Sequence, residues 1–273
     1  MTTPKNIPDY LSKQNPHERD AFITFDEGPH IYTIKDDPHP YTSVTTWNHS
    51  HFDHFDANTI IDNMMRSKNW KTNKYYGKTK QDILQLWEQN RDEAAQAGTR
   101  LHFDIECYYN MCPTIENDSI EYKYFMKFAE DYKHLKPYRT EWMIWHEDIK
   151  IAGSIDMVFE EEDGTLLIYD WKRSKEIVKT SGFNKYAQTE CINHLPDTNY
   201  WHYSLQLNVY KRILEEKYNK TIGGLFLVCL HPNNKNQSYL RIPCADLQNE
   251  VDELFELRKQ QLQQTYQLET III

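Results

Sequence analysis

The stretch GSIDMVFEEEDGTLLIYDWK, residues 153–172, places charged side chains inside a segment that otherwise has the pattern of an apolar β-hairpin. Apolar residues alternate on both sides of a polar turn, which favours two antiparallel strands joined by the three-residue loop 162–164. In the register that this loop sets, Asp156 lies directly opposite Asp170. Lys172 shares their face of the hairpin because it lies two residues further along the same strand.

The other face of this hairpin collects apolar side chains, and their burial fixes the register. They are Ile155, Met157, Phe159, Leu167, Tyr169 and Trp171. Two opposed carboxylates repel each other, and burial strengthens the repulsion unless a positive charge lies between them. A divalent cation meets this need, because Mg²⁺ prefers carboxylate oxygens, waters and phosphate. The alternative is a solvent-exposed sheet end, where Lys172 alone bridges Asp156 and Asp170.

The whole chain has 273 residues, enough to bury a sizeable core. It shows no apolar run long enough to cross a bilayer and no signal peptide at its start, so we expect a soluble, intracellular protein without a membrane partner. The five cysteines contain no CxxC pair, which favours reduced thiols. A net charge of −10 argues against general adhesion to polyanions, so nucleic-acid contact would depend on local basic patches or bound cations.

Apolar periodicity predicts an α/β protein. Strands are expected at 21–26, 30–34, 41–47, 138–146, 150–160, 165–172, 223–230 and 237–242, and helices at 57–68, 79–90, 91–110, 118–135, 203–218 and 245–266. Asp56 has the position of an N-cap for the first of these helices. Because no Gly/Ser-rich linker divides the chain, we expect residues 1–90 to be an N-terminal β/helical elaboration that packs on a core of residues 91–273.

The hairpin motif resembles that of the PD-(D/E)XK nucleases, in which an aspartate on one strand is followed by acid-X-lysine on the next. Here GSID ends at Asp156, and DWK covers residues 170–172. The resemblance is specifically to the RecB-like branch, which includes the mitochondrial genome maintenance exonuclease and the CRISPR adaptation nucleases. Two further motifs of that branch appear in the expected order between about residues 92 and 231: GTRLHFDIE before the hairpin and QLNVY after it.

The resemblance implies a restriction-endonuclease-like core with a central mixed β-sheet flanked by helices. It also implies a set of site residues. Metal ligands for one or two Mg²⁺ or Mn²⁺ ions would be His102, Asp156, Asp170 and the backbone carbonyl of Trp171, and the catalytic set would be Asp156, Asp170, Lys172, Glu106, Gln206 and Tyr210. Several relatives carry a four-cysteine iron–sulfur cluster, which these cysteines cannot be arranged to form, so we expect no cluster.

A basic segment interleaved with aromatic residues, RSKNWKTNKYYGKTK at positions 66–80, contains no acid. Lysines for phosphates and aromatic rings for base stacking are what binding to single strands requires. The predicted nucleic-acid contacts are Lys68, Trp70, Lys71, Lys74, Tyr75 and Tyr76, with Arg173 and Lys175 from a second basic run after the hairpin. The alternative for the first segment is a solvated, mobile loop.

The function expected from the resemblance is metal-dependent hydrolysis of phosphodiester bonds in DNA. We expect an exonuclease that acts on single-stranded ends or flaps in replication, repair or recombination. The alternatives are a non-catalytic nucleic-acid-binding module with the same fold and an RNA-directed endonuclease. A glycosidase with paired carboxylates is a weaker alternative, because Lys172 beside the acids and the basic patches disfavour it.

Overall fold

The hairpin of residues 153–172 forms as expected in a computed structural model of the chain, which describes residues 8–113, 116–182 and 184–272. Its strands pair in the predicted register, from Met157 opposite Tyr169 to Glu160 opposite Leu166. Gly164 takes the left-handed conformation at φ 83° that the three-residue loop requires. The predicted register is therefore observed for residues 157–160 and 166–169, and the ladder stops one residue before Asp156 and Asp170.

A six-stranded mixed sheet surrounds this hairpin, which confirms the α/β prediction. Its strands are β3 (Thr42–Ser43), β4 (Lys136–His146), β5 (Ile151–Glu160), β6 (Leu166–Lys172), β7 (Ile222–Cys229) and β8 (Leu240–Pro243). A separate antiparallel pair is formed by β1 (Ile23–Asp26) and β2 (Ile31–Ile34). In the sheet, β4–β5, β5–β6 and β7–β8 are antiparallel, whereas β3–β5 and β6–β7 are parallel.

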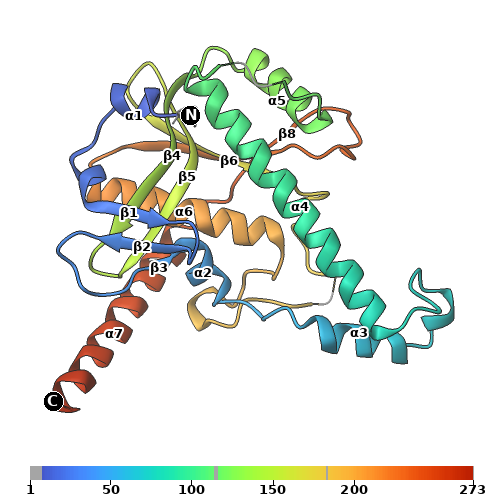
Figure 1. The fold of residues 1–273 in the computed structure, drawn as a ribbon. Coiled ribbons are helices and arrows are strands. Elements are labelled where there is room, and N and C mark those ends of the chain that lie inside the picture. Colours follow the sequence, from blue (N-terminus) through green and yellow to red (C-terminus); the bar gives the residue numbers. More distant parts are fainter. Residues whose placement is uncertain (1–7, 114–115, 183, 273) are drawn as a thin grey trace, which may run out of the picture. The chain divides into compact units, whose positions relative to one another are not determined.

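The helices of the described residues surround this sheet or belong to the segment before it (Figure 1). The α-helices are α1 (Tyr10–Gln14), α2 (Val44–His49), α3 (Ala57–Arg66), α4 (Lys80–Tyr109), α5 (Ile120–Asp131), α6 (Asn199–Lys217) and α7 (Gln248–Ile272), and the short 3-10 helices are η1 (Glu18–Phe22), η2 (Trp70–Thr72) and η3 (Glu190–Ile192). Asp56 caps α3 as predicted, because its Oδ1 accepts the N–H groups of Asn58 and Thr59. The two helices expected over 79–110 are one continuous helix, α4. No helix in these ranges is long and apolar enough to span a membrane.

The strand expected at 41–47 is wrong beyond its first residues. Only Thr42 and Ser43 form a strand, and α2 begins at Val44. The Ser43 hydroxyl accepts the N–H of Thr46 at 3.0 Å, so Ser43 caps a helix that the β-branched sequence does not favour. Val44 and Trp47 are buried against the main core, and this packing outweighs local propensity.

The chain divides into two compact units. One unit contains the described residues of 1–53 and 102–273, and the other is His54–Leu101. Residues 1–53 therefore belong with the sheet, while the smaller unit holds α3, η2 and the first part of α4. We refer to these as the sheet unit and the helical unit.

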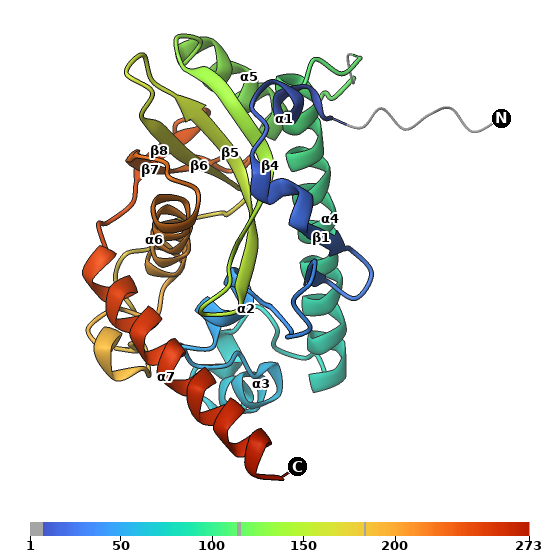
Figure 2. The same cartoon turned by 90° about the vertical axis from the view of Figure 1, so that its left-hand side faces the viewer.

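Within the sheet unit, α6 and α7 lie on one side of the sheet (Figure 2). Leu205, Leu207 and Ile213 of α6 are buried in the main core together with Ile155 of β5. By contrast, Trp171 packs its ring against Phe125 and Phe128 of α5, at 5.7 and 5.3 Å between ring centroids. The apolar face expected to be continuous along the hairpin thus serves two different packing surfaces.

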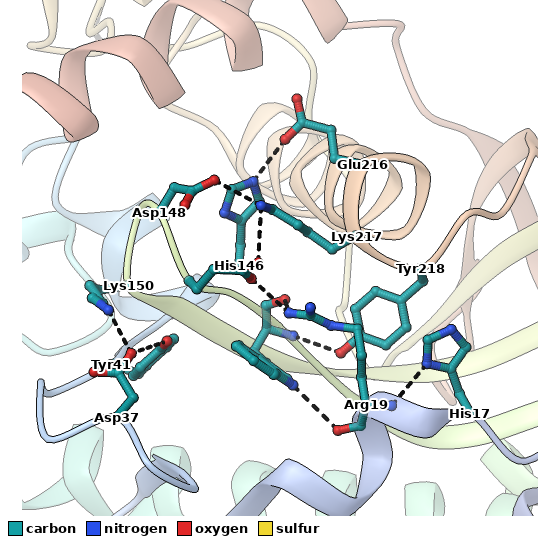
Figure 3. Close-up of polar contacts among 12 residues, drawn as sticks. His17, Arg19, Asp37, Tyr41, His146, Asp148, Lys150, Glu216, Lys217 and Tyr218 are labelled. Atoms are coloured by element: carbon teal, nitrogen blue, oxygen red, sulfur yellow. Dashed lines mark hydrogen bonds and ion pairs between the residues drawn. The ribbon is translucent and has the colours of Figure 1, made fainter.

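The N-terminal segment is fixed to β4 by a polar network (Figure 3). Arg19 donates to the carbonyl of Trp145 at 3.0 Å and to Glu147 at 2.8 Å, and its guanidinium lies 3.7 Å from the centroid of the Trp145 ring. Tyr218, at the C-terminal end of α6, also belongs to this network, because its hydroxyl accepts the N–H of Trp145 at 3.1 Å. These contacts explain why residues before the predicted core boundary are integral to the sheet unit.

Candidate metal centre

The sheet divides at the sequence GSID, residues 153–156, where one edge of β5 changes its partner strand from β3 to β6. We call this point the fork of the sheet, and the candidate site lies there. One edge of β5 pairs with β4 along its length. The opposite edge pairs with β3 at residues 151–152 and with β6 at residues 157–160. Residues 153–156 lie between these two ladders, so their backbone on this edge is left to side chains and ligands.

Asp156 uses its carboxylate where the β5–β6 ladder stops. Its Oδ2 accepts the backbone N–H of Trp171 at 2.9 Å. The Nε2 of His102, on α4, lies 2.9 Å from the Trp171 carbonyl, and because a carbonyl only accepts, Nε2 must be the donor. The Nδ1 of neutral His102 is then unprotonated, and it lies 3.5 Å from Asp156 Oδ2. Histidine ligands of metals are usually oriented by such a bond from the other ring nitrogen.

Three potential metal ligands meet at this point: His102, Glu141 and Asp156, whose donor atoms all lie within 4.8 Å of one another. They come from α4, β4 and β5. One imidazole and two carboxylates suit Mn²⁺ and also Mg²⁺. Of the other predicted ligands, Asp170 lies outside this group of three, and the Trp171 carbonyl accepts the bond from His102.

Glu141 was not among the predicted site residues. The β4–β5 register on either side of it places Glu141 opposite Asp156. Its carboxylate accepts a hydrogen bond from the hydroxyl of Ser154 at 3.0 Å. Its φ of 41° is left-handed, an arrangement that costs a non-glycine residue about 1–2 kcal/mol. Strain of this kind persists only where the surroundings hold it, and it is common at functional sites.

Asp20 of η1 holds the backbone around Glu141 from both sides. Its Oδ2 accepts from the guanidinium of Arg139 at 2.7 Å, and its Oδ1 accepts from the indole N–H of Trp142 at 2.9 Å. Arg139 and Trp142 are buried. The N-terminal segment therefore supports the strained strand residue that faces Asp156.

The acids of the site are buried enough to change their protonation. Burial raises the pKa of Glu141 to about 7, and the negative charge of Asp156 adds to this effect. Burial also raises the pKa of Glu106 to about 7. Glu106 and Glu141 line one cavity of about 260 Å³. Without a cation, this part of the site is expected to hold protons near neutral pH.

Asp170 and Lys172 form a close ion pair beside the three potential ligands. Lys172 Nζ lies 2.6 Å from Asp170 Oδ2, and the Asp170 side chain is only 3% exposed. Burial alone would lower the pKa of Lys172, but the charges of Asp170 and Asp156 outweigh it and raise that pKa above its ordinary value. The ammonium also lies 4.5 Å from the ring centroid of Tyr203. Lys172 is therefore a fixed positive charge and hydrogen-bond donor.

The predicted pair on α6 is also at this site. Gln206 Nε2 donates to the hydroxyl of Tyr210 at 3.1 Å, and the ring of Tyr210 packs against Gly153. A Cβ at residue 153 would lie 2.8 Å from Tyr210 Cε1, closer than real Cβ atoms approach. The absence of a side chain at Gly153 therefore leaves the space that the Tyr210 ring occupies.

Gly153→Ala is expected to destabilise the protein by about 1–3 kcal/mol, because the added methyl group must displace Tyr210 in a packed core. Denaturant unfolding measures the change. Gly98→Ala is the matched control, since a Cβ there meets nothing within 4 Å and alanine favours the helix. Equal unfolding free energies for Gly153→Ala and the wild type would contradict the packing argument.

The predicted nucleic-acid residues of 66–80 lie in the helical unit. The side chains of Lys68, Lys71, Lys74 and Tyr76 are exposed, and Trp70 and Tyr75 are partly buried. The Tyr75 hydroxyl accepts the indole N–H of Trp87 at 2.9 Å, so Tyr75 is held in place from α4. In the sheet unit, Lys175 is exposed, whereas Arg173 forms an ion pair with Glu121 of α5 at 2.8 Å. That pair gives Arg173 a structural partner within the fold.

A family model described as the PD-(D/E)XK nuclease superfamily matches residues 57–270. The chain belongs to this superfamily. A search of curated proteins found no match. The mixed sheet flanked by helices agrees with the restriction-endonuclease-like fold expected of a PD-(D/E)XK nuclease.

Glu141 could have been recognised from the same signal that pointed to Asp156. It is an acid in the middle of an otherwise apolar strand, YRTEWMIWH. The signal is weaker because the four-residue loop 147–150 between β4 and β5 contains no glycine to mark a turn, so the sequence does not show which residue Glu141 faces. Tyr203 gave no signal, because an aromatic residue on an amphipathic helix is most often part of a core.

Proposed function

We propose that this PD-(D/E)XK protein is a metal-dependent deoxyribonuclease of the RecB-like branch, without an iron–sulfur cluster. We further propose that it acts as an exonuclease on single-stranded DNA ends or flaps in replication, repair or recombination. The observation that carries the proposal is the meeting of His102, Glu141 and Asp156 at the fork of the sheet, with Lys172 beside them. The order of the four motifs along the chain supports the RecB-like assignment.

The residues at the fork fit a divalent cation. Glu141 and Asp156 are opposed acids in a partly buried place, and the pKa of Glu141 is raised accordingly. His102 directs its Nδ1 toward Asp156, at 3.5 Å from Oδ2. His102, Glu141 and Asp156 would hold Mg²⁺ or Mn²⁺, and Asp170 would join them only by exchanging Lys172 for the cation. Such an ion polarises the phosphoryl oxygen and lowers the pKa of a nearby water.

The chain's own residues have separable roles in this proposal. Lys172 stabilises the negative charge that develops on the phosphate during attack, a role for which its raised pKa suits it better than for that of a base. Asp170 holds the Lys172 ammonium in position, and Trp171 orients His102 through its carbonyl. Gln206 and Tyr210 fix the wall of the site next to Gly153. Glu106 is placed to accept a proton at the cavity that it shares with Glu141.

Cleavage assays on end-labelled substrates test this function. We expect Mg²⁺ or Mn²⁺ to support degradation of single-stranded DNA, with EDTA as the control that stops it, and we expect mononucleotides or short products from one end. Circular single-stranded DNA separates exonuclease from endonuclease action. Cleavage of RNA alone would favour the RNA-directed alternative, and metal-independent binding without cleavage of any substrate would favour the non-catalytic module.

A further inference from the structure

The helical unit contains an aromatic groove that none of the proposed catalytic steps uses. The groove has a volume of about 750 Å³ and lies between the start of α3 and the first half of α4. It is lined by Phe55, Ala57, Gln81, Leu84, Trp87, Glu88, Asn90 and Arg91. The ring centroids of Phe55 and Trp87 are 6.2 Å apart, with an angle of 40° between the ring planes. Both rings therefore contribute to the wall of the groove.

The exposure of Phe55 is unusual for a large apolar side chain. It is 67% exposed, although burying a phenylalanine is worth about 1.5–3 kcal/mol. Phe55 directly precedes Asp56, the N-cap of α3. An apolar residue at this position commonly packs against the first turns of the helix. That role needs contact with the helix, however, and does not explain why the ring remains so accessible beside Trp87.

Charge favours a polyanion as the partner of this unit. Residues 54–101 contain eight Lys and Arg and six Asp and Glu, which gives this unit a net charge of +2. Because the whole chain has a net charge of −10, the other residues together have a net charge of −12. Within the helical unit, Lys74 Nζ lies 4.8 Å from the ring centroid of Tyr75, whose hydroxyl bonds to Trp87. Direct contacts thus connect Lys74 to Tyr75, and Tyr75 to Trp87, which lines the groove.

The rim of the groove carries hydrogen-bonding groups. Gln81 and Asn90 are exposed, and within the described residues neither side-chain amide has a recorded hydrogen bond. Arg91 pairs with Glu88 and Asp92, so its charge is largely offset. Aromatic faces with amides at the edge match the two features of a nucleobase, a π-face and a polar edge.

We propose that the groove between Phe55 and Trp87 binds an unpaired nucleobase of a single-stranded polynucleotide whose phosphates meet the neighbouring lysines. This inference deepens the proposed function by adding a substrate subsite, and it rests on that function only for the kind of nucleic acid that is bound. Bases in a duplex are stacked and paired, so the groove selects for single strands. It is distinct from the basic segment 66–80, because Phe55 and Trp87 lie outside that segment.

The test is fluorescence anisotropy of the full chain with a labelled 12-nucleotide oligothymidylate and with a blunt duplex, in EDTA, across a salt series. Phe55→Ala is expected to weaken oligothymidylate binding by about 5- to 100-fold, the effect of one lost stack. The slope of log affinity against log salt should stay that of the wild type, because no phosphate contact is lost. Ile31→Ala, which removes an exposed apolar side chain from β2 in the sheet unit, is the matched control and should bind normally.

Three outcomes would overturn the inference. They are equal oligothymidylate affinity of Phe55→Ala and wild type, a loss that merely follows a lower melting temperature, and a preference of the wild type for the duplex. An oligothymidylate with abasic sites should bind wild type and Phe55→Ala equally, because it offers no base to stack. Cleavage by the wild type with Mg²⁺ or Mn²⁺ is measured in parallel. If cleavage fails while Phe55→Ala still weakens oligothymidylate binding, the proposed function is wrong and the groove assignment stands. If cleavage occurs and Phe55→Ala binds like the wild type, the groove assignment is wrong and the proposed function stands.

Discussion

Asp156→Asn is expected to lower the rate of DNA cleavage by about 100- to 1,000-fold while the protein stays folded. The substitution removes a carboxylate charge from the group that also contains His102 and Glu141. It retains a side-chain oxygen that can accept the N–H of Trp171, the bond that Asp156 makes where the β5–β6 ladder ends. Single-turnover cleavage of labelled single-stranded DNA with saturating Mn²⁺ measures the effect, and circular dichroism with thermal unfolding checks the fold.

The control for Asp156→Asn is Glu162→Gln, which removes the same charge from the exposed turn of the same hairpin. Its cleavage rate should equal that of the wild type. Near wild-type cleavage by a folded Asp156→Asn protein would show that the fork of the sheet is not the catalytic site. Loss of folding in Asp156→Asn would instead show that the bond to Trp171 requires a full carboxylate, and Asp156→Glu would then separate charge from geometry.

Local sequence signals were sufficient for the hairpin at the centre of the site. A three-residue loop with glycine in the left-handed position sets the register. The distance from Asp156 to Asp170 in the chain is short enough for these local rules to apply. The same holds for the cap at Asp56 and for the shared helical face of Gln206 and Tyr210, which depend on neighbouring residues alone.

Contacts between distant segments were not accessible in this way. The fork arises because β3, far earlier in the chain, takes part of an edge of β5 that β6 does not cover. Glu141 faces Asp156 across the β4–β5 hairpin, whose loop 147–150 lacks the glycine that marks the β5–β6 turn, and Asp20 supports Glu141 from the distant N-terminal segment. The same dependence on tertiary packing explains α2, where Val44 is buried in the core and Ser43 caps a helix in a sequence that favours a strand.

The motif-based prediction also treated the two aspartates as equivalent, and the structure separates their surroundings. Asp156 lies with His102 and Glu141, whereas Asp170 is paired with Lys172. Electrostatics decides this division, because the buried ammonium requires one carboxylate as its partner. Whether Asp170 exchanges that partner for a cation is a question of affinity, which the spacing of the residues in the sequence cannot answer.

Glu141→Gln is expected to stabilise the metal-free protein at pH 8 and to have little effect at pH 5. Burial and the charge of Asp156 raise the pKa of Glu141 from 4.5 to about 7. A carboxyl whose pKa is raised by folding favours the folded state fully below its unfolded pKa, and this contribution is lost as the pH rises through the folded pKa. The free energy of unfolding of the wild type in EDTA should therefore fall between about pH 4.5 and pH 7.5. Glutamine resembles the protonated acid and should remove about 2–3 kcal/mol of that fall.

The same substitution should abolish most of the stabilisation by a divalent cation, because it removes one of three converging ligands. In the wild type at pH 8, Mn²⁺ relieves the repulsion between Glu141 and Asp156 and raises the unfolding free energy according to its affinity for the folded state. Denaturant unfolding at pH 5 and pH 8, with EDTA or Mn²⁺, measures both effects, and Glu162→Gln again serves as the control. Glu106, whose pKa is also raised to about 7, should leave a residual pH dependence in the variant. Glu141 would lie outside the metal centre if the unfolding free energies of Glu141→Gln and wild type ran parallel with pH and responded equally to Mn²⁺. A buried acid that neither titrates nor binds the cation has no part in the electrostatics of the metal centre.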